Sequence, residues 1–285
     1  MADILRITRD DARYPEALNA VAGMPDVLYV RGNAELLSRP GIAVVGTRRM
    51  SEYGRQAARQ MSEAFVRAGF TVISGLALGV DAVAHRAALD AGGATVAVLG
   101  SGVDDAMVGP RQNLPLARDI LSHGGLLVSE YPPGSPADRW TFPARNRIIS
   151  GLSKGVLIVE ADIKSGALIT ARLAGEQGRD VFAVPGGIYW PRSAGTNYLI
   201  QQGAKAVCTP ADVLEEYGVR AGAAMPVSTS DPVHARIVAI LEDGPKHMDD
   251  IVAASGMTAA QIVSALSIME LDGTVANADG TFRIS

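Results

Sequence analysis

The stretch IAVVGTRRM, residues 42–50, places an apolar run directly before a glycine, a hydroxyl and two arginines. Further apolar runs of the same kind follow at residues 70–75, 94–100, 125–130, 155–161 and 180–186. Each run is aliphatic at successive positions, which is typical of a strand covered on both faces. The quoted run therefore predicts the first strand of a parallel sheet, with a polar loop at its end.

Helical patterns separate these runs. Apolar residues recur at spacings of three and four between Tyr53 and Ala68, with Ser51 placed to cap a helix and Gly69 placed to end it. Similar patterns occur at residues 81–89, 116–121 and 168–174. Alternating strands and helices predict an α/β fold, a Rossmann-like parallel sheet with helices on both faces. Ligands of such sheets bind beyond the carboxyl ends of the strands.

The chain is expected to have four parts. Residues 1–39 carry turn signals and predict an N-terminal cap on the sheet domain, which spans 40–217. Residues 218–232 are rich in Gly, Ala, Ser and Pro and predict a linker. Residues 233–285 hold short helical patterns and two strand-like pieces around Asn277 and Gly280. This order suggests a small C-terminal winged-helix domain of the helix-turn-helix type.

The composition limits the classes of protein to which the chain can belong. The net charge is −4, so an anion site must be a local concentration of positive charge. No apolar run approaches the roughly 18 residues of a membrane span, and the N-terminal stretch lacks the apolar core of a signal peptide. The one cysteine, Cys208, fits a reducing cytoplasm and is expected to be buried. The four histidines lie far apart, so we expect no metal.

Small and polar residues follow three of the predicted strands, at 46–49, 74–79 and 100–102. Glycines let backbone N–H groups approach a ligand, and the helix that follows adds its positive end, so such loops suit phosphate. Any one loop could also be an ordinary turn. Neither GxGxxG nor GxxxxGK[ST] occurs at the first loop, so neither a dinucleotide nor a P-loop nucleotide is supported and no cofactor is expected.

The segment 138–151 combines basic and aromatic residues. Its arginines are Arg139, Arg145 and Arg147, and they surround Phe142 and Asn146. Arginine offers a rigid fork of donors to phosphate, and an aromatic face stacks any base. The segment therefore indicates single-stranded nucleic acid, with a surface ion-pair network around a buried aromatic ring as the alternative.

Catalytic residues are harder to find in the sequence. No histidine or carboxylate can be assigned as the partner of a nucleophilic serine, and Glu130 and Glu160 more readily pair with arginines than act as acids. The glycines of 184–187, followed by Gly195 and Thr196, are similar to the phosphate loop of Rossmann-like nucleotide hydrolases. A nucleotide or phosphoribosyl hydrolase is therefore the alternative to a protein that only binds.

The predicted winged helix is acidic. Residues 231–285 hold three basic and eight acidic residues, and the expected recognition helix, 258–271, contains no Lys or Arg. A winged helix that binds duplex DNA neutralises several phosphates. We therefore expect this domain to contact protein, or only to pack, instead of binding duplex strongly.

Long motifs resemble those of one family. They are VVGTR (44–48), SGLALGVDAVAH (74–85), AVLGSGVD (97–104), LLVSEYPPG (126–134), FPARNRIISGLS (142–153), the run from VLIVEADIKSGALITA to VFAVPG (156–186), and GTNYLIQQGA (195–204). In this order they are similar to the DNA-processing protein A family, DprA/Smf. The resemblance implies sequence-independent binding of single-stranded DNA, homodimerisation, and loading of the RecA recombinase during natural transformation.

The resemblance also implies roles for particular residues. The residues that match the family's DNA-binding loops and its basic segment are Gly46, Thr47, Arg48, Ser74, Gly75, Ala77, Arg139, Phe142, Arg145, Asn146, Arg147, Ser165 and Gly166. Leu199 and Ile200 match the segment used for self-association, and Gln201 is implied to lie near the recombinase. Residues 105–110 depart from the family's Tyr-Pro turn, so the resemblance does not carry the family's contacts over to this loop.

Overall fold

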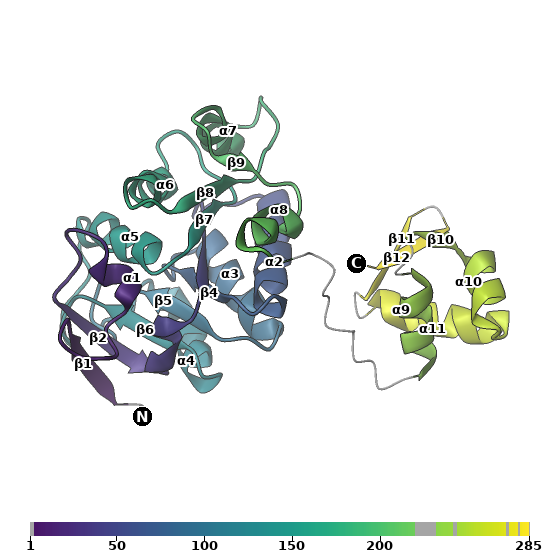
Figure 1. The fold of residues 1–285 in the computed structure, drawn as a ribbon, viewed down its shortest axis with the longest axis horizontal. Coiled ribbons are helices and arrows are strands. Elements are labelled where there is room, and N and C mark those ends of the chain that lie inside the picture. Colours follow the sequence, from purple (N-terminus) through teal and green to yellow (C-terminus); the bar gives the residue numbers. More distant parts are fainter. Residues whose placement is uncertain (1–2, 220–231, 242–243, 272–273, 279, 285) are drawn as a thin grey trace. The chain divides into compact units, whose positions relative to one another are not determined.

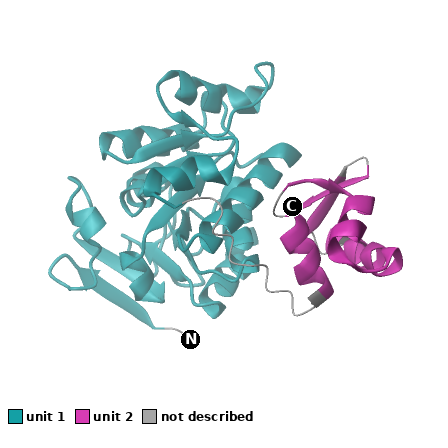
Figure 2. Ribbon diagram, turned by 45° about the vertical axis from the view of Figure 1, so that its right-hand side comes forward, with its two compact units in different colours: residues 1–222 teal, residues 223–285 magenta. Residues whose placement is uncertain are grey.

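A computed structural model describes residues 3–219, 232–241, 244–271, 274–278 and 280–284. The chain forms two compact units, residues 1–222 and 223–285 (Figure 2). The boundary between the units falls inside the predicted linker, 218–232, most of which lies outside the described residues.

Unit 1 is built on a nine-stranded sheet in the order β1-β2-β6-β5-β4-β3-β7-β8-β9 (Figure 1). The strands are β1 (Ile4–Thr8), β2 (Val27–Gly32), β3 (Gly41–Val45), β4 (Thr71–Ser74), β5 (Thr95–Val98), β6 (Leu126–Ser129), β7 (Gly155–Ile158), β8 (Asp180–Ala183) and β9 (Lys205–Ala206). In this order, every pair of neighbouring strands from β6 to β9 is parallel. Each of the six runs predicted as parallel strands forms one, so the α/β prediction is confirmed.

Helices cover both faces of this sheet. One face packs against α1 (Glu16–Asn19), α5 (Thr141–Gly151) and α6 (Gly166–Glu176), and the other against α2 (Glu52–Arg67), α3 (Val80–Asp90), α4 (Leu114–Ser122) and α8 (Pro210–Leu214). Successive residues of β3 alternate between the faces, because strand side chains point to opposite sides in turn. Ala43 and Val45 join the core under α5 and α6, whereas Ile42 and Val44 join the core under α2 and α3.

Helix α2 begins and ends where the sequence predicts. The Ser51 hydroxyl accepts a hydrogen bond from the backbone N–H of Gly54, which satisfies one of the free donors of the first turn. Gly69 follows the helix with a φ of 85°, a conformation that favours glycine.

Residues 1–39 do not form a separate cap. Strands β1 and β2 extend the main sheet, and β2 pairs antiparallel with β6 in a register that sets Val30 opposite Val128. Leu28 and Val30 are fully buried. The prediction of a cap was wrong because pairing with a strand almost a hundred residues later leaves no local signal in the sequence.

Unit 2 has the order of a winged helix. Its elements are α9 (Pro232–Leu241), β10 (Lys246–His247), α10 (Met248–Ser255), α11 (Ala259–Leu271), β11 (Val275–Ala278) and β12 (Thr281–Ile284). The three strands form an antiparallel sheet in the order β10-β12-β11. Ile237, Ile251 and Ile262, one from each helix, are fully buried in a core of their own. The predicted winged-helix domain is confirmed.

Three further findings concern residues outside any site. Cys208 is exposed, not buried as expected, because it follows the edge strand β9 and donates its backbone N–H to Asp212 in a surface turn. Among the described residues, no single helix has the length and apolar character to cross a membrane, although α10 and α11 pass this test together with a bend of 118° between them. The described part of the chain holds no cluster of three or more potential metal ligands.

Candidate nucleic-acid interface

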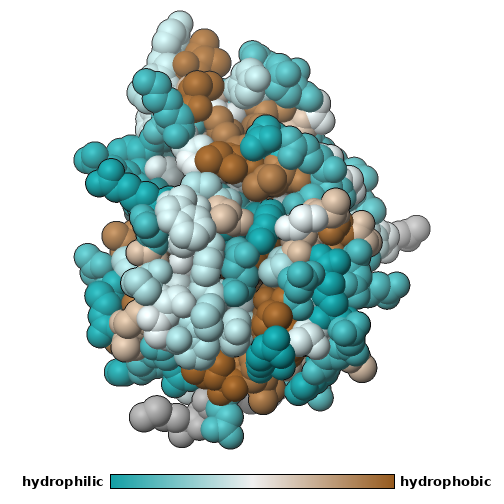
Figure 3. Space-filling model, turned by 90° about the vertical axis from the view of Figure 1, so that its left-hand side faces the viewer, coloured by the Kyte–Doolittle hydropathy of each residue, from teal (hydrophilic) through white to brown (hydrophobic). Residues whose placement is uncertain are grey.

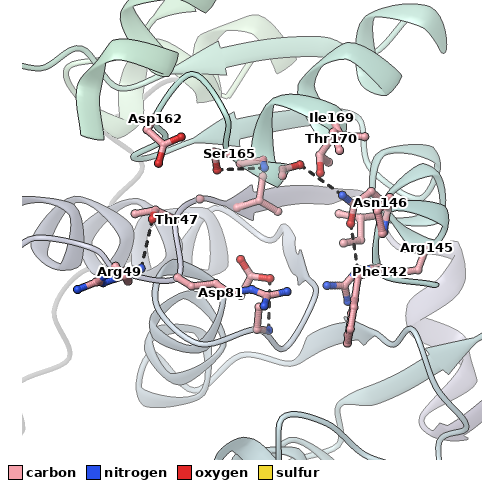
Figure 4. Close-up of a pocket in the computed structure, with 18 of the residues that line it drawn as sticks. Thr47, Arg49, Asp81, Phe142, Arg145, Asn146, Asp162, Ser165, Ile169 and Thr170 are labelled. Atoms are coloured by element: carbon pink, nitrogen blue, oxygen red, sulfur yellow. Dashed lines mark hydrogen bonds between the residues drawn. The ribbon is translucent and has the colours of Figure 1, made fainter. Parts of the chain in front are cut away.

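A pocket of about 500 Å³ opens at the carboxyl ends of β3 and β7. The chain runs from β3 to β4, β5 and β6 on one side and then returns to β7 on the other side of β3. Parallel sheets bind ligands at such a switch point, because the loops on its two sides diverge and leave a crevice. The walls are the loop after β3, the loop after β7 and the first turns of α5 and α6 (Figure 4).

Most of the predicted DNA-binding residues line this pocket. They are Gly46, Thr47, Arg48, Ala77, Arg139, Phe142, Arg145, Asn146, Ser165 and Gly166. Figure 4 shows Thr47 and Arg49 on one side of the pocket, with Phe142 and Asn146 on the opposite side. The structure therefore brings residues that are up to 120 positions apart in the sequence to one rim.

Three arginines at the rim have exposed side chains. Arg48 and Arg49 follow β3, and Arg139 precedes α5. None of the three makes an ion pair with another described residue, whereas most arginines elsewhere in unit 1 do. The acidic side chains at the pocket are Asp81, which is buried, and Asp162, which is exposed. The rim therefore offers uncompensated positive charge to an anion.

Arg48 and Phe142 form a stacked pair. The guanidinium carbon of Arg48 lies 5.5 Å from the centre of the Phe142 ring, within the range of a cation–π contact. A smaller hollow of about 120 Å³ adjoins this pair and is also lined by Gly75, Leu78 and Pro110. Loop 105–110, which departs from the family's turn, therefore reaches the site through its last two residues, Gly109 and Pro110.

The donors of the second predicted phosphate loop are already used within the protein. The Asp81 carboxylate accepts hydrogen bonds from the backbone N–H groups of Gly75, at 3.1 Å, and Ala77, at 3.4 Å. The Ser74 side chain is fully buried and donates to the carbonyl of Val44 at 2.7 Å. The protein's own carboxylate thus takes the donors that a phosphate would need, and the geometry does not support phosphate contacts by Ser74 or Gly75.

Arg145 forms the floor of the pocket. It is 5 % exposed, and its Nη1 donates to the carbonyls of Gly75, at 2.6 Å, and Val98. Burial lowers the pKa of Arg145 to about 10, and the nearby carboxylate of Asp81 opposes this shift, so the group stays protonated at neutral pH. Burial raises the pKa of Asp81, against the attraction of Arg145. Arg145 therefore holds the loops together and exposes little of its surface to the pocket.

Arg147 lies outside the pocket. Its two terminal nitrogens donate to the two carboxylate oxygens of Glu130, at 3.0 and 2.7 Å, and both side chains are mostly buried. The neighbouring Asn146 does line the pocket, and its Nδ2 donates to the carbonyl of Gly166 at 3.5 Å. The Ser165 hydroxyl caps α6 by accepting from the N–H of Ala167. The charge of Arg147 is thus neutralised within the fold by Glu130.

Neither of the carboxylates considered as acids lines the pocket. Glu160 is 1 % exposed and accepts hydrogen bonds from the N–H of Ser51, at 2.8 Å, and from its hydroxyl, at 2.5 Å. It therefore occupies the positive end of α2, where a nucleotide phosphate binds in many sheets of this type. Glu130 is held by Arg147. Neither of these two glutamates is therefore free to act as the acid of a hydrolase at the pocket.

The predicted self-association segment lies on α7 (Ala194–Gln201). Leu199 packs partly against the core and, with Tyr198, lines a groove of about 590 Å³ between α6 and α7. Ile200 is half-buried and Gln201 is exposed, and neither lines the groove. Figure 3 shows hydrophobic atoms gathered on the upper part of the face that carries these two helices.

Sequence reasoning missed two members of the site. One is Arg49, which is exposed like Arg48 and lines the pocket beside it. Asp81 was read only as the start of a helix, because an acidic residue in a first turn is common. The signal that could have found Asp81 is its place four residues after Ala77, within reach of the N–H groups of a glycine loop.

Comparison with known proteins gives a consistent result. A family model described as DNA recombination-mediator protein A matches residues 6–218, and one described as DprA winged helix domain matches residues 221–281. Protein Smf of Escherichia coli (strain K12) is 40% identical over 286 residues, which cover 97% of this chain and 76% of that protein. DNA processing protein DprA of Bacillus subtilis (strain 168) is 44% identical over 72% of this chain and 68% of its own length.

Two solved structures share this fold at substantial identity. DprA from Streptococcus pneumoniae has a TM-score of 0.70 and 42% identity, over 75% of this chain and 74% of its own. DNA processing protein A from Helicobacter pylori, whose structure concerns its single-stranded DNA binding mode, has a TM-score of 0.66 and 30% identity, over 76% of this chain and 98% of its own. The family resemblance read from the motifs is thereby confirmed, and this chain belongs to the DprA/Smf family of DNA recombination-mediator proteins.

Proposed function

We propose that this protein binds single-stranded DNA without sequence preference at the pocket between β3, β7 and α5. The observation that carries the proposal is the group of exposed, unpaired arginines beside an aromatic ring, with Arg48 stacked on Phe142 at 5.5 Å. A site of this kind combines a positive groove for the backbone with a ring face for the bases. Membership in the family and the relative with a single-stranded DNA binding mode support the same function.

In this proposal Arg48, Arg49 and Arg139 bind phosphates, and the Phe142 ring stacks on a base. The adjoining hollow of about 120 Å³ takes one base beside the Arg48–Phe142 pair. Stacking does not depend on which base is present, so the binding is insensitive to sequence. The function is binding and positioning, and it requires no catalytic residue.

The strand-binding test compares matched variants. Arg48→Ala is expected to weaken binding of an oligothymidylate about tenfold or more, since a hydrogen bond to a charged group is worth about 1.5–3 kcal/mol. Phe142→Ala removes the stacking face and should weaken it similarly. Arg59→Ala is the control, because Arg59 lies on α2 and pairs with Glu63. Fluorescence anisotropy measures the affinity, and unchanged binding by Arg48→Ala would reject the pocket.

Salt provides an independent readout of the same contacts. Each phosphate neutralised on a single strand contributes about −0.7 to the slope of log affinity against log salt. Three arginines therefore predict a slope of about −2, which should fall by about 0.7 in Arg48→Ala. A slope near zero in the unmodified protein would contradict binding through the backbone.

We further propose that the protein loads RecA recombinase onto the bound strand in the cytoplasm, as a homodimer, during natural transformation and recombination. The description of the family model as a recombination mediator supports this role. The apolar groove along α6 and α7, which Leu199 lines, supports self-association through α7, the helix that also carries Ile200 and Gln201. The test measures RecA filament assembly on strands coated with a single-strand binding protein. The unmodified protein should accelerate assembly and Arg48→Ala should not. Sedimentation should give twice the mass of one chain.

A further inference from the structure

The loop between β8 and α7, residues 186–193, exposes three large side chains in a row. Ile188, Tyr189 and Trp190 are 80%, 90% and 54% exposed. Contiguous apolar side chains are rarely left in water without a partner, and such patches mark interaction sites. We call residues 188–190 the aromatic loop.

The aromatic loop lies at the same edge of the sheet as the pocket. Strand β7 pairs with β3 on one side and with β8 on the other, all in parallel, so the loops after the three strands leave the same edge. Neighbouring strands are about 4.8 Å apart, so the ends of β3 and β8 are about 10 Å apart. The loop after β7 lies between the two. Its residues Asp162 and Ser165 line the pocket, and its residue Ala161 contacts the segment that follows the aromatic loop.

Hydrogen bonds fix the segments on either side of the aromatic loop. The N–H of Ala161 donates to the carbonyl of Arg192, and the N–H of Gly195 donates back to Ala161, both at 2.8 Å. Asn197 exchanges two hydrogen bonds with the backbone of Gly186. Tyr53 of α2 donates its hydroxyl to the carbonyl of Pro185 at 2.8 Å. The exposed rings are therefore anchored to the loop after β7, which also forms a wall of the pocket.

Charge around the aromatic loop favours an anionic occupant. Arg192 lies two residues after the aromatic loop, and Lys164 belongs to the neighbouring loop after β7. Both side chains are exposed without an ion pair to another described residue. Arg49 lies across the end of β7 at the pocket rim. Of the acids in the segments next to the aromatic loop, Asp162 is exposed, Glu160 is buried and Glu52 pairs with Arg55. Rings interleaved with cations are typical of single-strand binding surfaces.

We propose that the aromatic loop is a second base-stacking platform for single-stranded DNA, which Tyr189 and Trp190 provide beyond the pocket. The inference rests on the proposed function, because it extends the same strand. A strand held at Arg48 and Phe142 crosses the end of β7, with phosphates near Arg49 and Arg192, and its next bases stack on the exposed rings. The pocket then sets whether the protein binds, and the aromatic loop lengthens the site.

The test uses the full chain and two oligothymidylates, a short strand of about 4 nucleotides and a long strand of about 16. These lengths are the limits of the site sizes found in single-strand binding proteins. Tyr189→Ala combined with Trp190→Ala should weaken binding of the long strand about fivefold or more and leave the short strand unchanged. Trp190→Phe, which keeps a ring, should retain most of the long-strand affinity. Ile268→Ala, which removes an exposed apolar side chain of 51% exposure from unit 2, is the control.

Fluorescence tests the contact without altering the loop. The chain has two tryptophans, so Trp140→Phe leaves Trp190 as the single indole. The long strand should quench its emission by stacking, and the short strand should quench it much less. No quenching at saturating long strand would overturn the proposal.

The outcomes separate the inference from the function on which it rests. If the unmodified protein binds neither strand, the proposed function fails. If it binds both strands and the double variant does so equally well, only the aromatic loop is overturned. A double variant that binds DNA normally but sediments as a smaller species would assign the loop to an interface between copies, which also overturns the proposal.

Discussion

At the scale of single residues, two arginines of one basic segment have opposite surroundings. Arg139 is exposed, and its guanidinium makes no ion pair with a described residue, whereas Arg145 is 5 % exposed and donates to two backbone carbonyls beside Asp81. The guanidinium of Arg139 is therefore available to a ligand, whereas that of Arg145 stabilises the fold.

This contrast predicts different results for two alanine variants. Arg139→Ala should lower single-strand affinity with little change in the free energy of unfolding. Arg145→Ala leaves Asp81 buried without its cation, and removing one partner of a buried pair costs about 3–5 kcal/mol. Urea unfolding of both variants, alongside strand binding, checks this. Equal stability of the two variants would contradict the structural role of Arg145.

His85 makes stability depend on pH. Its Nδ1 lies 2.8 Å from the Thr95 hydroxyl, which itself donates to Val72, so Nδ1 is the protonated nitrogen and the ring is neutral. Burial, with a smaller effect of Arg145, lowers the pKa of His85 to about 3 from 6.5. Below pH 6.5 His85 binds a proton in the unfolded chain but not in the folded protein. The contribution of His85 to the free energy of unfolding is therefore complete above pH 6.5 and is lost as the pH falls toward 3.

The expected loss from His85 between pH 7.5 and pH 5 is about 2 kcal/mol. His85→Asn keeps a donor for Thr95 and cannot titrate. Urea unfolding at both pH values should show a pH-dependent loss that is smaller in the variant by about that amount. The same loss in both proteins would mean that His85 takes up a proton as readily in the folded protein as in the unfolded chain.

At the scale of elements, α2 is joined to the sheet through its first turn. Glu160, after β7, accepts from both the backbone and the hydroxyl of the capping residue Ser51. Gly54 lies in that turn, and a Cβ there would meet the Glu160 carboxylate. The glycine is needed for this close approach and not for a left-handed backbone.

Two glycine-to-alanine substitutions in helices should therefore change the free energy of unfolding in opposite directions. Gly175→Ala in α6 has open space around the new methyl and should stabilise by about 0.5–1 kcal/mol, because alanine is the better helix former. Gly54→Ala should destabilise by about 1–3 kcal/mol, since Glu160 must leave Ser51 to make room. Thermal unfolding of the two variants measures this, and stabilisation by Gly54→Ala would contradict the contact.

At the scale of the whole molecule, the two units have separate cores and different charge. Every helix of unit 2 contributes to one core, and no described residue of that core belongs to unit 1. Residues 231–285 carry eight acidic and three basic residues, and α11 presents the exposed apolar residues Val263 and Ile268 instead of cations. This surface does not suit a DNA backbone.

A chain ending at residue 219 should therefore keep its affinity for single-stranded DNA within about twofold. The reason is that all the residues lining the pocket belong to unit 1. Anisotropy with the same oligothymidylate checks the affinity, and circular dichroism checks the fold. A large loss in a folded protein would assign part of the strand-binding surface to the winged helix.

The sequence by itself determined the parallel strands, the helices between them, the cap at Ser51 and the winged-helix order, because these depend on local periodicity and on residues a few positions apart. It also determined the family, through motifs such as VVGTR and FPARNRIISGLS. Only the tertiary structure decided that β2 pairs with β6, because strand pairing across the chain has no local signature. It also decided which arginines face the pocket, since burial and partners such as Asp81 and Glu130 come from distant segments that folding brings together.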